Sequence, residues 1–243
     1  MTVSPRAFRC VSCGAFWERH WPTCARCFEH GVIVPWSERP RAAVDAVPGA
    51  STARALSRMA WQSVEQAAYA ELRLGAGALV VAAGPPGAGK SSWACRLADA
   101  VRGPALLVAA EEGLSPSLAA RLLRCNVKRD DYHVLTRASV DAAVGYARQV
   151  KAVSMIVDSV QEAAWTASEL RHVLEVVDSL VLLVAVLQVT KAGLPAGSNA
   201  IQHEADVCVR VEAMRWSLTK SRYQDLKDVG GAVLATTREE DAA

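Results

Sequence analysis

The stretch Gly84-Pro85-Pro86-Gly87-Ala88-Gly89-Lys90-Ser91 decides the fold of this chain. It follows an apolar run at 78–83 and leads into a segment with helical spacing from Ser92 onward. A strand, a glycine-rich loop and a helix in this order form a phosphate cradle, because backbone N–H groups and the helix N-terminus all face the anion. Lys90 can then reach the β- and γ-phosphates, and the Ser91 hydroxyl can bind Mg²⁺. We therefore expect a nucleoside triphosphate to contact Gly84, Pro85, Pro86, Gly87, Ala88, Gly89, Lys90, Ser91 and Ser92.

The composition sets the size and class of the protein. The 243 residues are 51% hydrophobic and 21% charged, which suits one α/β domain with a small appendage. The net charge of +2 argues against an extended basic coat for nucleic acid, so any such contact must be local. The first ten residues lack a secretory signal, and the apolar run at 180–187 is too short to cross a bilayer. These features predict a cytoplasmic protein with no membrane contact.

Four of the seven cysteines lie close together near the N-terminus, in two Cys-x-x-Cys pairs. Each pair can hold one side of a tetrahedral metal ion, and a reducing cytoplasm disfavours two disulfides as the alternative. An all-thiolate site without an open position is structural, and it would supply the folding energy of a module this small. His20 and His30 lie nearby, but four thiolates complete the site without them. We expect Zn²⁺ to be bound by Cys10, Cys13, Cys24 and Cys27.

The remaining chain reads as a linker followed by alternating strands and helices. We place the zinc module at 1–33, a linker rich in Pro, Arg, Ala and Gly at 34–52, and one domain at 53–243. The expected strands are 78–83, 105–109, 132–135, 154–157, 180–187, 207–211, 215–219 and 232–235. The expected helices are 53–74, a helix from Ser92, 115–123, 139–151 and one to 177 that starts from a capping box at Thr166. A loop is expected at 189–204.

This alternation predicts an α/β fold with a mainly parallel sheet covered by helices. Ligands of such sheets bind at the carboxyl ends of the strands. Gly84, Glu111, Asp158 and Gln188 each follow a strand, so all four should meet at one edge. Asp158 suits the Mg²⁺ carboxylate that partners Ser91, and Glu111 is preferred over Glu112 for polarising the attacking water. Gln188 either senses the γ-phosphate or is simply a polar residue leaving the sheet.

Several motifs in one order resemble the RadA/Sms family of bacterial recombination ATPases, which have the RecA fold. The resemblance covers the chain from Phe8 to about Gly231. Besides the cysteine module and the phosphate loop, it is carried by 110–112 (AEE), 157–161 (VDSVQ), 190–193 (TKAG), the spacing of Gly197, His203 and Asp206, and 220–223 (KSRY).

The resemblance implies a ring, hexameric in the family, that hydrolyses ATP while it moves along single-stranded or branched DNA in recombination, repair or replication. It implies that Lys220 and Arg222 neutralise charge on the γ-phosphate of a neighbouring subunit, as an arginine finger supplied in trans. The loop at 189–204 would face the central channel, with Lys191 as the DNA contact. A helicase or recombinase is a further possible partner.

The chain also departs from the family pattern. Ser221, Tyr223 and Gln224 replace Asn, Phe and Gly of the family motif, and the interval from Asp158 to Glu169 is shorter than the family's first DNA-facing loop. The Lon-like C-terminal domain of the full-length family is expected to be absent. Two other functions are weighed: a regulatory or helicase-loader ATPase whose zinc module docks a partner protein, and a P-loop kinase. The kinase hypothesis lacks an Arg-rich lid and leaves the zinc module without a task.

Overall fold

The computed structural model describes the strands at 8–10, 16–17 and 33–35 and residues 63–66, 68–189, 199–227 and 229–234. The chain divides into two compact units, Met1–Ala60 and Trp61–Ala243, and each is considered by itself. In the first unit, β1 (Phe8–Cys10) pairs antiparallel with β2 (Phe16–Trp17) and with β3 (Ile33–Pro35).

The predicted zinc site falls largely on residues outside this description. Cys13, Cys24 and Cys27 lie outside the described residues, and of Cys10 only the backbone at the end of β1 is described. Zn²⁺ binding by these four cysteines therefore stays a prediction.

In the described part of the second unit, eight strands form one sheet in the order β11-β10-β9-β4-β8-β7-β5-β6. The run from β9 to β6 is parallel, and β10 and β11 add an antiparallel edge. This confirms the α/β class and the mainly parallel sheet. The strands are β4 (Ala78–Gly84), β5 (Ala105–Ala109), β6 (Tyr132–Leu135), β7 (Ser154–Asp158), β8 (Leu182–Gln188), β9 (Val207–Glu212), β10 (Arg215–Ser221) and β11 (Gly230–Ala232).

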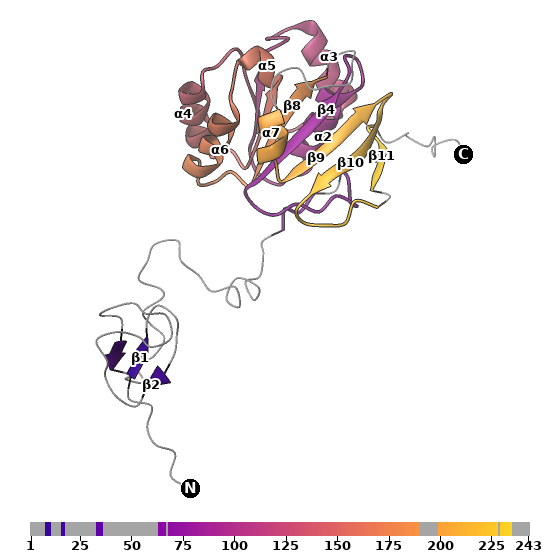
Figure 1. The fold of residues 1–243 in the computed structure, drawn as a ribbon. Coiled ribbons are helices and arrows are strands. Elements are labelled where there is room, and N and C mark those ends of the chain that lie inside the picture. Colours follow the sequence, from indigo (N-terminus) through magenta and orange to yellow (C-terminus); the bar gives the residue numbers. More distant parts are fainter. Residues whose placement is uncertain are drawn as a thin grey trace. The chain divides into compact units, whose positions relative to one another are not determined.

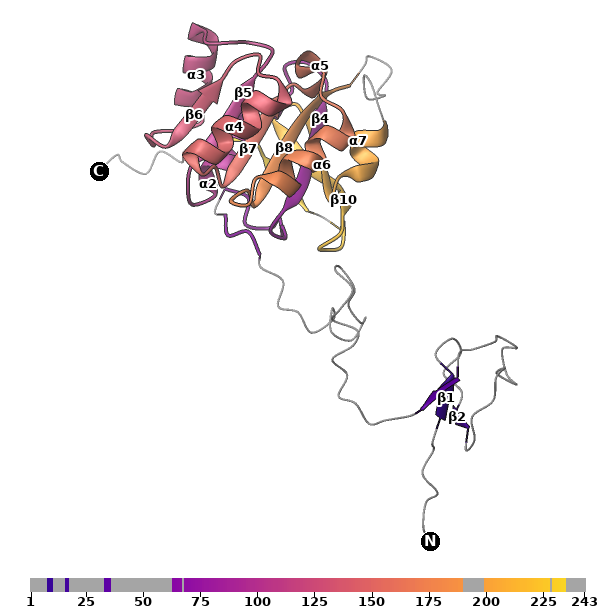
Figure 2. The same ribbon diagram turned by 90° about the vertical axis from the view of Figure 1, so that its left-hand side faces the viewer.

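Helices cover both faces of the sheet (Figures 1 and 2). Successive residues of β4 point to opposite faces, so Val80 packs in one apolar core and Val81 in the other. The core on the Val80 side includes buried residues of α2 and α3, and the core on the Val81 side includes those of α4, α6 and α7. The helices are α2 (Lys90–Ala100), α3 (Pro116–Arg124), α4 (Val140–Val150), α5 (Val160–Ala163), α6 (Ala167–Val176) and α7 (Asn199–Glu204).

The helix starts follow the expected local chemistry. The Ser115 side chain accepts a hydrogen bond from the backbone N–H of Leu118, with Pro116 at the first helical position of α3. Thr166 and Glu169 form a complete capping box at the start of α6. Both predicted caps are therefore confirmed.

The helix expected at 53–74 is wrong over its described part. Residues 68–71 form a turn, residues 64–66 and 72–74 are irregular, and Ser63 pairs with Gly75 in an isolated bridge. The Gln66 side chain bonds both the N–H and the carbonyl of Tyr69, which offers the backbone an alternative to helical bonds. Tyr69 is buried together with Leu72 and Leu74, so packing against the domain core favours this path.

Two further expectations near the C-terminus need correction. Part of the loop expected at 189–204 is helix α7, whose Ile201 is buried in the core beside α6. The strand expected at 232–235 lies instead at Gly230–Ala232, as β11, and residues 233 and 234 follow it as a bend. Gly230 pairs with Ser217 of β10 at a distance that leaves no room for a side chain. Residue 235 lies outside the described residues.

Candidate functional site

The glycine-rich loop connects β4 directly to α2 at the carboxyl edge of the sheet. Gly87 and Gly89 have φ angles of +73° and +100°, which glycine adopts without strain. Gly89 is the N-cap of α2 and supplies no side-chain cap, so the first N–H groups of the helix remain available to a ligand. Gly84 serves a different purpose, because a Cβ there would collide with the carbonyl oxygen of Val211 in β9.

Lys90 is the first residue of α2 and is only 6% exposed. Its Nζ donates to the carbonyl oxygen of Pro85 at 2.8 Å, so the side chain folds back over the loop. Burial lowers the pKa of Lys90, while the carboxylates of Asp158 and Glu111 oppose that shift. The ammonium group is thus placed among carboxylates in a partly desolvated site.

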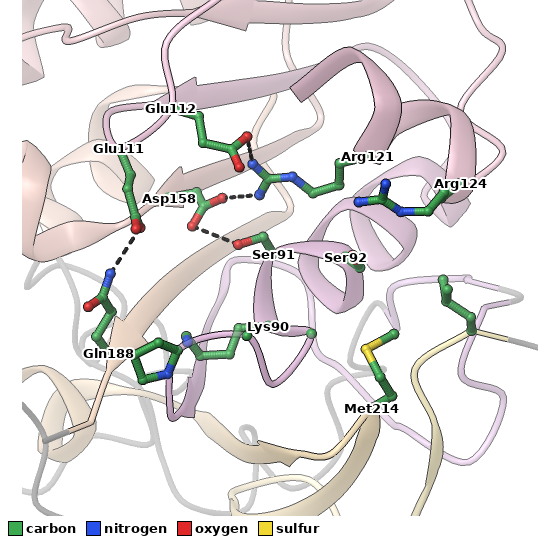
Figure 3. A pocket seen from close by; sticks show the side chains of 14 residues that line it. Lys90, Ser91, Ser92, Glu111, Glu112, Arg121, Arg124, Asp158, Gln188 and Met214 are labelled. Atoms are coloured by element: carbon green, nitrogen blue, oxygen red, sulfur yellow. Dashed lines mark hydrogen bonds and ion pairs between the residues drawn. The ribbon is translucent and has the colours of Figure 1, made fainter. Parts of the chain in front are cut away.

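Asp158 ends β7 beside the loop, and both of its carboxylate oxygens have partners (Figure 3). Oδ1 accepts a hydrogen bond from Ser91 Oγ at 3.1 Å, and Oδ2 accepts one from the Arg121 guanidinium at 2.6 Å. Arg121 also forms an ion pair with Glu112. No sequence motif singled out Arg121. The available signal was its position three residues after Leu118, on the apolar face of α3.

The two glutamates after β5 point to different partners (Figure 3). Glu111 accepts a hydrogen bond from the side chain of Gln188 at 3.0 Å, whereas Glu112 faces Arg121. The backbone N–H of Glu111 donates to the carbonyl of Asp158, which fixes the loop against the end of β7. The structure therefore brings Glu111, Gln188 and Asp158 to the same edge as Lys90.

These residues line a cavity of about 340 Å³, which we call the edge pocket. This volume lies within the range of small-molecule sites. Met214 lies on the side of Ser92 and Arg124, away from Glu111 and Gln188 (Figure 3). The edge pocket is lined by Pro86, Gly87, Gly89, Lys90, Ser91, Ser92, Glu111, Glu112, Arg121, Arg124, Asp158, Gln188, Met214 and Leu234.

The hairpin between β9 and β10 contacts the glycine-rich loop through the backbone. Ala213 and Met214 both have positive φ angles, of 47° and 60°, which makes the tight turn. The N–H of Met214 donates to the carbonyl of Ala88 at 3.1 Å, and the carbonyl of Met214 accepts from Val233 N–H at 2.8 Å. Sequence reasoning missed this contact because it joins segments that are far apart in the chain.

The edge pocket offers oxygen ligands that fit a hard divalent cation. The Ser91 hydroxyl and the Asp158 carboxylate are donors that Mg²⁺ prefers, and their hydrogen bond places them side by side. In the described residues, no group of three or more His, Cys, Asp or Glu side chains is arranged to hold a metal ion. Bound phosphate oxygens would therefore have to supply the remaining ligands.

Lys220 and Arg222 lie near the amino-terminal ends of the parallel strands, whereas the edge pocket lies at their carboxyl ends. β10 runs antiparallel to β9, and Lys220 is paired with Cys208 near the start of β9. Its Nζ donates to the carbonyl oxygens of Gln202 and His203 at 2.9 and 2.7 Å. The structure thus does not bring these two cations to the pocket of their own chain. Lys191 lies outside the described residues.

A buried carboxylate holds Arg222 in place. Asp206 is 6% exposed and accepts hydrogen bonds from Arg171 and from the backbone N–H of Leu79, while Arg222 Nη1 lies 3.1 Å from its Oδ1. The residues that depart from the family motif also have local tasks. Ser221 Oγ accepts from the backbone N–H groups of residues 223 and 224, and the Gln224 side chain bonds the backbone at 71 and 73.

Comparison with known proteins shows a distant similarity. The chain is 28% identical over 180 residues to a protein of Mycolicibacterium smegmatis named DNA repair protein RadA. The match covers 64% of this chain and 39% of that protein. No family model matches the chain. The similarity supports a relationship to RadA and its RecA-like fold. None of the helices in the described part of the chain has the length and apolar run that crossing a bilayer requires.

Proposed function

We propose that the protein is an ATP-hydrolysing, DNA-dependent ATPase of the RadA/RecA type that acts in DNA repair, recombination or replication. The observation that carries this proposal is the edge pocket, where the Ser91–Asp158 hydrogen bond lies beside the N-terminus of α2 and Lys90. The similarity to a protein named DNA repair protein RadA supports the choice of ATPase class and of DNA as a partner.

In this proposal each residue of the edge pocket has a distinct task. The N–H groups at the start of α2 and the Lys90 ammonium bind the β- and γ-phosphates. Ser91 and Asp158 hold Mg²⁺, which when bound neutralises phosphate charge. Met214 and Arg124 lie toward the nucleoside, because they are on the far side of the pocket from Glu111 and Gln188.

Glu111 orients the attacking water and accepts its proton. It is exposed to the pocket, where its carboxylate accepts a hydrogen bond from Gln188, while Glu112 is engaged by Arg121. A positioned base of this kind contributes about 10²–10⁴-fold to a rate. Gln188 senses the γ-phosphate, because its side-chain amide can release the Glu111 carboxylate and donate its hydrogen bond to a phosphate oxygen instead.

We further propose that the subunits form a ring in which Lys220 and Arg222 act on the ATP of a neighbour. Their position at the edge opposite their own pocket favours action in trans. Lys191 is the proposed DNA contact, and because a single lysine binds phosphate weakly, several subunits must present it together.

Mixing two inactive variants tests the ring. Lys90→Ala lacks a working phosphate site, and Arg222→Ala lacks the finger. A mixed ring contains some junctions at which both are intact, so ATPase activity should recover on mixing. Full activity of Arg222→Ala alone, or a protein that stays monomeric with ATP and DNA present, would refute the ring.

A titration of the ATPase rate against single-stranded, duplex and branched DNA tests the overall function. Stimulation by DNA supports the proposed motor. Stimulation only by a protein partner would indicate a helicase-loader ATPase whose N-terminal module docks that partner, and the appearance of a phosphorylated small molecule would indicate a kinase.

A further inference from the structure

Arg121 is a buried cation inside the edge pocket that the mechanism above does not use. The residue is 6% exposed, and it lies on the buried face of α3 together with Leu118. Its guanidinium donates to Asp158 Oδ2 at 2.6 Å and pairs with Glu112 (Figure 3). One side chain therefore bridges the two carboxylates.

Arg121 stays protonated in this position. Burial acts to lower the pKa of Arg121, but the carboxylates of Asp158 and Glu112 more than compensate, so its pKa is raised. Taking a guanidinium out of water is costly unless its partners are well placed. Here both partners are anions that would otherwise repel each other across the same pocket.

Two close carboxylates beside a hydroxyl are the kind of ligands that collect a divalent cation. Asp158, Glu112 and Ser91 would form such a group if Arg121 were absent. With Arg121 in place, Asp158 has one oxygen on Ser91 and the other on the guanidinium. The position between the two carboxylates is thus already filled by positive charge.

We propose that Arg121 is an internal counter-ion that keeps divalent cations out of the pocket until a nucleotide brings its phosphates. Arg121 is a positioning residue in this account: it holds Asp158 toward Ser91 and holds Glu112 away from the Glu111 side. The inference rests on the proposed function in one respect, the assignment of Asp158 as the Mg²⁺ carboxylate. Its consequence is that Mg²⁺ enters together with ATP rather than before it.

The test measures Mn²⁺ binding to the nucleotide-free chain of residues 1–243 by electron paramagnetic resonance, with Zn²⁺ supplied beforehand to occupy the cysteines. Arg121→Gln should bind one Mn²⁺ per chain in the edge pocket, with an affinity at least about tenfold higher than that of the same pocket in wild type. The reason is that a positive unit charge beside the ion has been removed. Adding Glu112→Gln to that variant should abolish the gain. Arg124→Gln is the matched control, since Arg124 lines the same pocket but has no ion pair among the described residues, and it should bind Mn²⁺ like wild type.

Arg121→Met fills the same space without charge, and it serves if Arg121→Gln does not fold. Tight Mn²⁺ binding by nucleotide-free wild type would overturn the proposal whatever the variants do, and so would folded Arg121 variants that bind no more Mn²⁺ than wild type. ATP binding, measured on the same samples, separates this result from the proposed function: wild type that fails to bind ATP refutes the ATPase, while the Mn²⁺ comparison still judges the counter-ion.

Discussion

Gly84→Ala tests whether the edge pocket depends on the close contact between β4 and β9. Gly84 is buried at the end of β4, and an added Cβ would collide with the backbone carbonyl of Val211. A backbone group cannot rotate away as a side chain can, so the end of β9 would have to move. The adjoining turn carries Met214, whose N–H binds the glycine-rich loop at Ala88. The substitution should therefore disturb both stability and nucleotide binding.

The expected loss of stability follows from two opposing effects. Overpacking against a rigid neighbour costs about 2–3 kcal/mol. The unfolded chain of the alanine variant has less conformational freedom, which returns about 0.4–1 kcal/mol. The net loss of about 1–2.5 kcal/mol corresponds to a Tm lower by about 2–10 °C for a domain of this size.

Gly145→Ala is the matched control, because Gly145 is an exposed residue inside α4 and an added Cβ there would meet nothing within 4 Å. This variant should gain about 0.5–1 kcal/mol and raise Tm by about 1–4 °C. Thermal unfolding followed by circular dichroism measures both. If Gly84→Ala unfolds at the same temperature as wild type, or shifts upward as Gly145→Ala does, the argument from the Val211 contact is wrong.

Three further predictions address the site, the N-terminal module and the pH dependence. Glu111→Gln should bind ATP normally and lower the hydrolysis rate by about 10²–10⁴-fold; wild-type turnover in this variant together with loss in Glu112→Gln would show that the wrong carboxylate was chosen. Elemental analysis should find one Zn²⁺ per chain. A chain that begins at Pro35 should lose the zinc and keep its basal ATPase activity. Absence of zinc, or a zinc content unchanged by the truncation, would contradict the four-cysteine site. Glu169→Gln should lower the free energy of unfolding at pH 7 by less than about 1 kcal/mol. The hydrogen bonds from Thr166 lower the pKa of Glu169 in the folded state. The stabilisation by the ionised Glu169 carboxylate is therefore complete above the ordinary carboxylate pKa, and it should vanish as the pH falls through the lowered pKa.

Local sequence patterns predicted the elements that build the edge pocket. Apolar runs marked the buried strands, and Ser115 and Thr166 marked helix starts, because caps and periodicity are properties of short segments. The position of a polar residue directly after each strand was enough to gather Glu111, Asp158 and Gln188, since parallel strands share one carboxyl edge.

Features that depend on packing between distant segments were not predictable in this way. Arg121 lies on an otherwise apolar helix face, and only the fold shows that this face meets Asp158. The contact of Met214 with the glycine-rich loop joins residues from opposite ends of the domain. The segment at 63–74 has helical spacing, yet the side-chain hydrogen bonds of Gln66 and the burial of Tyr69 favour turns.

The most direct test of the account is the binding of ATP to the edge pocket, measured by titration calorimetry with Mg²⁺ present. Wild type should bind about one ATP per chain. Lys90→Ala removes a charge-assisted bond to phosphate worth about 1.5–3 kcal/mol, and it should weaken binding by about 10–100-fold. Lys128 is exposed and does not line the pocket, so Lys128→Ala should bind ATP with the affinity of wild type. Failure of wild type to bind ATP, or equal affinity of wild type and Lys90→Ala, would contradict the assignment of this edge as a nucleotide site.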